Sequence, residues 1–171
     1  MVTNPSGLTL KKYNSEYIMG QQQLLLVILV TIIVGIATVV AINTFGSAAD
    51  QANVDAVTND IATLASAAQG YYMRPEMLGG GSRQFTGLTF EGLAFPANGV
   101  SADSSTAQNE NGRYEIANIT ATSFDIIANP SSGEDYVPGP VDEDGVLSGG
   151  TDAIAGDRIT ATVGPNDFTF N

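Results

Sequence analysis

An uncharged stretch near the N-terminus most constrains what this chain can fold into. No charged residue lies between Glu16 and Asp50, and Leu24 to Ile42 is a run of 19 residues in which only two threonines and one glycine dilute the apolar character. At about 1.5 Å per helical residue such a run reaches about 28 Å, close to the thickness of the hydrocarbon core of a bilayer. The sequence therefore predicts one helix that spans a membrane once.

The charges on the two sides of this run differ in sign. Both lysines, Lys11 and Lys12, precede it, whereas the residues after it carry four arginines and seventeen acidic side chains. Because positive loops stay in the cytoplasm, we expect residues 1–20 inside and the acidic remainder outside the inner or cytoplasmic membrane. The net charge of −12 also argues against nucleic acid as a partner, since phosphate binding needs clustered Lys and Arg.

Helical periodicity continues after the apolar run. Apolar residues recur at intervals of three and four along one face, and the residues between them are rich in alanine, which favours helix. This stripe, which we expect to pack against a sheet, consists of Val54, Val57, Ile61, Leu64, Ala68 and Tyr71. Proline disfavours helical geometry in the preceding residue, so Arg74-Pro75 predicts the end of one continuous helix over about 21–73. The triple glycine 79–81 that follows predicts a flexible joint.

From Ser82 onward the helical period disappears and short apolar or alternating runs lie between turn residues. These runs predict strands. They are FTGLTF (85–90), RYEIANI (113–119), SFDIIA (123–128), RITATV (158–163) and FTF (168–170), with long loops expected at 96–112 and 129–157. The predicted fold class is α+β, with a long N-terminal helix packed on a small C-terminal antiparallel sheet.

Four segments of the chain follow from this pattern. Residues 1–20 form a short basic leader, residues 21–45 an apolar half-helix, residues 46–78 an amphipathic half-helix, and residues 79–171 a β-rich head.

The side chains available for chemistry argue against an enzyme. The chain has no His and no Cys, and its lysines lie in the leader, so nucleophilic triads and thiolate or imidazole zinc sites cannot be assembled in the exported part. We expect no cofactor other than calcium, for which oxygen ligands are offered by Asp142, Glu143, Asp144 and Asp152. Their spacing does not match the calcium loop of an EF-hand. Asn118-Ile119-Thr120 fits a glycosylation acceptor, although the strand predicted there would hinder modification.

The leader and the helix start resemble those of type IV pilins and the pseudopilins of type II secretion. The shared features are a short basic leader, a glycine at position 20, and a polar-edged apolar helix that begins QQQLLLVILV. The resemblance implies cleavage between Gly20 and Gln21 by a prepilin peptidase on the cytoplasmic side. It also implies polymerisation through the apolar helix, with Gln21, Gln22, Gln23, Leu24, Leu25, Ile28, Ile32 and Ile36 as assembly positions.

Two features depart from the pattern of the family. Leu25 stands at the fifth mature position, where bacterial pilins usually carry a glutamate that meets the terminal amine of a neighbour. The proline usual midway through the helix is also missing, with Ile42 near its place. As a substitute for the glutamate, we hypothesise that the three glutamine amides supply hydrogen bonds at the new helix start without a charge.

The function that the resemblance implies is that of a structural subunit of a type IV pilus-like filament, either a surface pilus for adhesion or motility or a major pseudopilin of a secretion system. Its expected partners are copies of itself, the prepilin peptidase, a pilus or secretion assembly platform, and the membrane before assembly. The assembled filament would be extracellular or periplasmic. The alternative is a non-polymerising, single-span anchored domain that binds an extracellular ligand.

Overall fold

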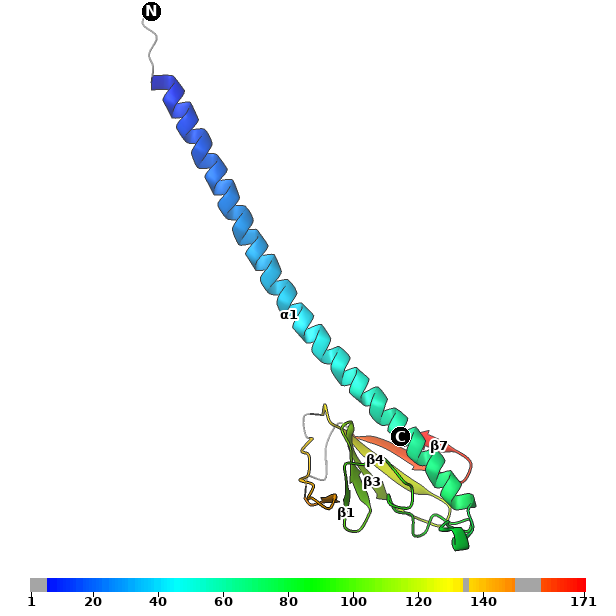
Figure 1. Cartoon of the computed structure of the whole chain (residues 1–171). Coiled ribbons are helices and arrows are strands. Elements are labelled where there is room, and N and C mark those ends of the chain that lie inside the picture. Colours follow the sequence, from blue (N-terminus) through cyan, green and yellow to red (C-terminus); the bar gives the residue numbers. More distant parts are fainter. Residues whose placement is uncertain (1–5, 134–135, 150–157) are drawn as a thin grey trace, which may run out of the picture. The chain divides into compact units, whose positions relative to one another are not determined.

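The computed structural model describes residues 6–133, 136–149 and 158–171, with side chains described from Gly20 onward. The chain divides into two compact units between Ala48 and Ala49. One helix, α1 (Ser6–Met73), contributes to both units (Figure 1). The predicted helix is confirmed, and in the structure it also includes residues of the leader. It ends one residue before Arg74-Pro75, as the steric restriction on a residue before proline requires.

The second unit, which we call the head, contains a seven-stranded sheet within the described residues. Its strands are β1 (Gly99–Ser101), β2 (Thr106–Gln108), β3 (Gly112–Ala117), β4 (Phe124–Pro130), β5 (Val146–Leu147), β6 (Ile159–Val163) and β7 (Phe168–Phe170). The order across the sheet is β5-β1-β2-β3-β4-β6-β7. All neighbouring strands are antiparallel except β1 and β5, which are parallel. The α+β fold is therefore confirmed.

Four of the five predicted strands are found as β3, β4, β6 and β7. The strand predicted at 85–90 is wrong, because that segment forms turns. Phe85, Leu88 and Phe90 are nevertheless buried, and Gly87 takes a left-handed φ of 85° between them. The apolar residues of this run thus fill the core from a loop, and a short apolar run alone does not separate these two outcomes.

Three short strands lie in segments predicted as loops. β1 and β2 fall within 96–112, and β5 falls within 129–157. Each has only two or three residues, too few to show an alternating pattern, and they pair because the longer hairpin of β3 and β4 provides an edge for them.

The core of the head lies between the C-terminal part of α1 and one face of the sheet. Val57, Ile61 and Leu64 of the predicted stripe are buried there, while Val54 and Tyr71 are half-buried. The sheet contributes every second residue, as the pleat requires. On β3, β4 and β6 these residues are Tyr114, Ile116, Phe124, Ile126, Ala128, Ala161 and Val163, and Ala107 of β2 is buried with them. The head therefore begins within α1, at Ala49, and the helical segment 49–73 is part of its core.

Aromatic rings close the core at the end of α1. The rings of Tyr72 and Phe85 have centroids 4.8 Å apart, and those of Phe85 and Phe124 are 5.0 Å apart. Tilted pairs at such distances add to the stabilisation from burial alone. Ala65, also buried, and Tyr72 lie beside the predicted stripe and widen it by one helical position.

The triple glycine closes the end of α1 and is not a free joint. The N–H groups of Gly81, Ser82 and Arg83 donate to the carbonyls of Tyr71, Arg74 and Tyr72, at 2.9, 3.0 and 2.8 Å. Carbonyls that the helix end leaves without intrahelical partners are thereby satisfied. A Cβ at Gly80 would overlap the backbone of Arg74, and one at Gly81 would overlap that of Gln84. Close packing explains Gly80 and Gly81, and a left-handed φ of 73° explains Gly79.

Candidate functional site

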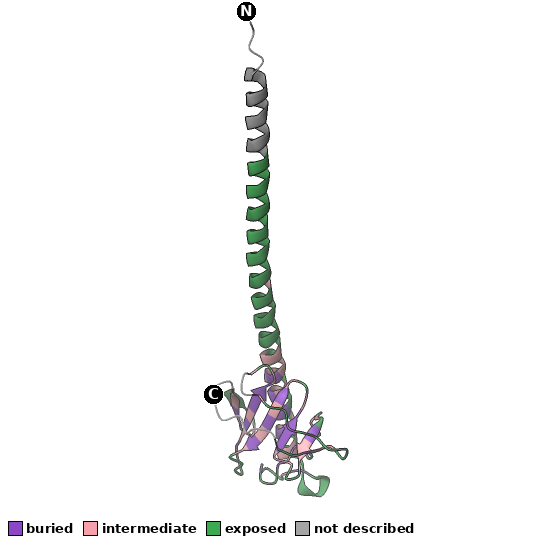
Figure 2. Ribbon diagram, turned by 90° about the vertical axis from the view of Figure 1, so that its left-hand side faces the viewer, coloured by how far each residue is buried: buried purple, intermediate pink, exposed green. Residues whose placement is uncertain are grey.

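The apolar segment of α1 is exposed on all sides in the single chain. Its large apolar side chains from Leu24 to Phe45 are between 46% and 75% exposed (Figure 2). Among the described helices, α1 from Gly20 is the one that is long and apolar enough to cross a membrane. A helix that is apolar on every face needs an apolar environment, which is either lipid or other helices.

The three threonine hydroxyls of this segment are bonded within the helix. The hydroxyls of Thr31, Thr38 and Thr44 donate to the carbonyls of Ile28, Val34 and Val40, at 2.8, 2.8 and 2.9 Å. This back-bonding to the preceding turn removes the need for water at these positions. The segment can therefore enter a hydrocarbon layer without leaving a hydroxyl unpaired.

The predicted assembly residues all lie on this exposed part of α1. Gln21, Gln22 and Gln23 are exposed and continue the helix without interruption. Gly20 is exposed as well, and a Cβ there would meet nothing within 4 Å. The remaining assembly positions, Leu24, Leu25, Ile28, Ile32 and Ile36, are 46–66% exposed and free to contact other chains. Cleavage after Gly20 stays a prediction.

A polar cluster that the sequence did not predict links α1 to the turn between β2 and β3. The Asp60 carboxylate accepts hydrogen bonds from the Tyr114 hydroxyl at 2.6 Å and from the amides of Asn109 and Asn111, both at 2.9 Å. Burial alone would raise the pKa of Asp60, but the bonds from Asn111, Tyr114 and Asn109 outweigh it and hold that pKa below its ordinary value. Burial also raises the pKa of Tyr114, as do the hydrogen bond to Asp60 and its charge.

We call this cluster around Asp60 a clamp, because it holds α1 to the sheet. A second clamp, around Asn53, lies two helical turns earlier on the same face of α1. The Asn53 amide donates to the Asn111 carbonyl at 2.9 Å and to the Ser131 hydroxyl at 3.1 Å, and its oxygen accepts from the backbone and hydroxyl of Ser132. Asn53 and Asp60 are seven residues apart, which brings them to one face of a helix. That spacing is the signal in the sequence that could have revealed both clamps.

The predicted calcium ligands lie in the loop around β5. One carboxylate oxygen of Asp142 accepts the backbone N–H groups of Asp144 and Val146, at 3.1 and 2.7 Å, which folds the loop into a turn. The side chains of Asp142, Glu143 and Asp144 are exposed, and Asp152 lies outside the described residues. Within residues 6–133, 136–149 and 158–171 no three such groups are placed to hold a metal ion. Calcium binding at this loop stays a prediction.

The glycosylation acceptor lies in a turn and not in a strand. β3 ends at Ala117, and Asn118 follows with a left-handed φ of 50° and an exposed side chain. The Asn118 amide donates to the Asp125 carboxylate at 2.8 Å, and the Thr120 hydroxyl bonds to Ser123.

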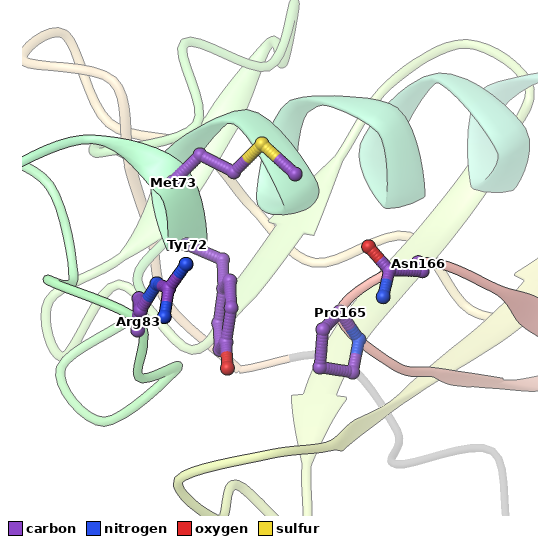
Figure 3. Close-up of a pocket in the computed structure, with 5 residues that line it drawn as sticks. All are labelled: Tyr72, Met73, Arg83, Pro165 and Asn166. Carbon is purple, nitrogen blue, oxygen red and sulfur yellow. The ribbon is translucent and has the colours of Figure 1, made fainter.

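A pocket of 540 Å³ lies in the head beside the end of α1 (Figure 3). It is lined by Tyr72, Met73, Arg83, Pro165 and Asn166, which come from α1, the loop after it and the turn between β6 and β7. In the close-up the Tyr72 ring stands between the Arg83 guanidinium and the Pro165 ring. The pocket thus combines apolar surface with one cation, and no pattern in the sequence indicates it.

No protein-family model, curated protein or solved structure matches this chain. The residues themselves form an exposed apolar helical segment and a packed α+β head.

Proposed function

We propose that this chain is a structural subunit of a type IV pilus-like filament, held in the membrane by its apolar helix before assembly. The observation that carries the proposal is the apolar segment from Leu24 to Phe45, whose fifteen large apolar side chains are exposed in the single chain. Burying each such side chain is worth about 1.5–3 kcal/mol, so the segment does not stay in water. A bilayer and a bundle of identical helices are the two environments that a pilin uses in turn.

Leader cleavage is the step that would separate the membrane-held chain from the assembled subunit. A prepilin peptidase acting between Gly20 and Gln21 would remove both lysines and leave a mature chain whose first charged side chain is Asp50. The new helix start would have N–H groups without partners beside a terminal amine. The three glutamine amides would supply acceptors there, in place of the glutamate that Leu25 replaces.

The mature N-terminus tests the proposal most directly. We expect intact-mass and peptide analysis of the chain from its native membrane to give a start at Gln21. Shearing of the cells and electron microscopy should then show fibres that contain this subunit, if the filament is a surface pilus. The small residues Ser47-Ala48-Ala49 could mimic a signal-peptidase site. A chain that keeps Met1, or that is cut after Ala49 and starts at Asp50, and that stays monomeric, would instead support the anchored binding domain.

The glutamine hypothesis has its own test. Replacing Gln21, Gln22 and Gln23 together by leucine should lower the filament yield, because the amide hydrogen bonds at the helix start are lost while the apolar surface is kept. Replacing Leu26 by isoleucine is a matched control that changes no polar group. Unaltered cleavage and unaltered yield in the triple variant would contradict the hypothesis.

A further inference from the structure

Assembly of such a filament needs directional contacts that its apolar helix does not supply. A helix that leaves lipid for a bundle of helices moves between two equally apolar environments, so the hydrophobic effect gives little net gain. The side chains from Leu24 to Ile42 also carry no charge that could set the register between copies. The register must then come from the heads or from the helix start.

The head carries an exposed apolar and cationic patch at the C-terminal end of α1. We call it the basic end, and it consists of Met73, Arg74, Met77, Leu78 and Arg83. Met77 is 96% exposed, and Met73 and Leu78 are each 69% exposed. The hydrogen bonds that close the helix end hold Arg74 and Arg83 in one compact loop, which with Glu76 has a net charge of +1. The pocket beside Tyr72 opens next to it.

The opposite end of the same helical segment is acidic. We call it the acidic end, and it consists of the exposed side chains of Asp50, Asp55 and Glu110. Glu110 belongs to this end because its neighbours Asn109 and Asn111 are bonded to Asp60, and Asn111 also to Asn53. Residues 49–73 contain three aspartates and no lysine or arginine. Exposed alanines at 49 and 52 give this end small apolar surface between the acids.

The basic end and the acidic end are complementary in charge, whereas two copies of the same end are not. Asp55 and Arg74 are separated by about 28 Å along one helix, so they cannot meet within one head. Pairing of two basic ends or of two acidic ends would oppose like charges, which disfavours both pairings. Contact between different patches on identical chains is heterologous, and such contacts build open helical filaments when the rotation does not close a ring.

We propose that the basic end of one head docks on the acidic end of the head of a second copy, and that this contact sets the register of the filament. The inference rests on the proposed function. The arginines would meet the carboxylates, while the methionines and Leu78 would pack on the alanine surface of the partner helix. Methionine suits such a contact because its side chain adapts to an irregular surface.

Charge reversal in the full chain, expressed with its native assembly machinery, tests this contact. One variant carries Arg74→Glu and Arg83→Glu, and the other carries Asp50→Arg, Asp55→Arg and Glu110→Arg. Each alone should lower the yield of sheared filaments by about tenfold or more, because every contact then opposes like charges. Co-expression of the two variants should restore the yield, since a reversed basic end can then meet a reversed acidic end in alternating copies.

A chain that carries all five reversals should also form filaments alone, because both ends are then exchanged. The control reverses an exposed acid elsewhere, Glu91→Arg, and should leave the yield unchanged. A wild-type filament yield from either single-end variant would overturn the proposed contact. So would the absence of recovery in both the mixture and the five-reversal chain. Either result leaves the filament itself established. If the wild-type chain forms no filament, the proposed function and this inference fail together.

Discussion

Asp60 is the residue on which the attachment of α1 to the turn between β2 and β3 depends most, because one carboxylate accepts three hydrogen bonds. Replacing it with alanine leaves the Tyr114 hydroxyl and two asparagine amides without this acceptor. Unsatisfied buried groups cost about 1–3 kcal/mol, so we expect Asp60→Ala to lower the free energy of unfolding of the head by about 2 kcal/mol. Thermal unfolding of the detergent-solubilised chain, followed by near-UV circular dichroism, measures this loss. The exposed Asp55→Ala is the matched control and should change little.

The charge of Asp60 adds a pH dependence with a definite sign. Its pKa in the folded head lies below the ordinary value, so the charged form stabilises the fold. This contribution is complete above the unfolded pKa of about 3.9 and is lost as the pH falls through the folded pKa. The difference in unfolding midpoint between the wild type and Asp60→Asn should therefore shrink below about pH 4. A difference that stays constant down to acidic pH would show that the charge plays no part.

Two glycines near the C-terminal end of α1 differ in their surroundings, because Gly81 is closely packed and Gly70 is not. Gly81→Ala places a Cβ against the backbone of Gln84, so the closing turn must open and the head should lose about 2–4 kcal/mol of stability. Gly70→Ala lies in the last turns of the helix with nothing within 4 Å of the new Cβ, and it should gain about 0.5–1 kcal/mol. The same unfolding measurement compares the two. Equal effects of both substitutions would contradict the packed closure.

At the scale of the whole molecule, the apolar segment decides where the chain can reside. A lysine near the middle of a membrane helix costs about 2.5–3.5 kcal/mol on insertion scales, so Ile33→Lys should reduce both membrane retention and filament yield. Thr38→Val is the control, since its hydroxyl is already bonded to Val34 and no partner loses a bond. Carbonate extraction of membranes followed by immunoblotting measures retention. Retention of Ile33→Lys equal to that of wild type would contradict a membrane-spanning role.

The long periodic features were predictable from the sequence, whereas three of the four shortest strands and the polar contacts were not. The helix over 21–73 and the strands at 113–119 and 158–163 have enough residues to show their periods, and all three were found. The run at 85–90 failed because buried apolar residues in a loop have the same composition as a strand. The three short strands β1, β2 and β5 have no visible period and exist only because neighbouring strands pair with them.

One candidate site was predictable from the sequence, and the others depend on contacts between residues far apart in the chain. The exposed apolar segment was evident from the sequence because nothing but composition defines it. The clamps at Asn53 and Asp60 were not, since their partners lie 49 to 79 residues away in the chain. The basic end likewise became visible only when the closing turn brought Arg83 back to the end of α1.

Hydropathy and periodicity along the chain are enough to predict one apolar helix for lipid or for other helices, followed by an acidic α+β head. These properties are local, because hydropathy and periodicity act through neighbouring residues. The folded structure was needed to show which polar groups hold the helix to the sheet and why glycines stand at 79–81. It was also needed to show that opposite charges lie at the two ends of the head. These depend on contacts between distant residues, whose free energy is gained only after the chain has folded.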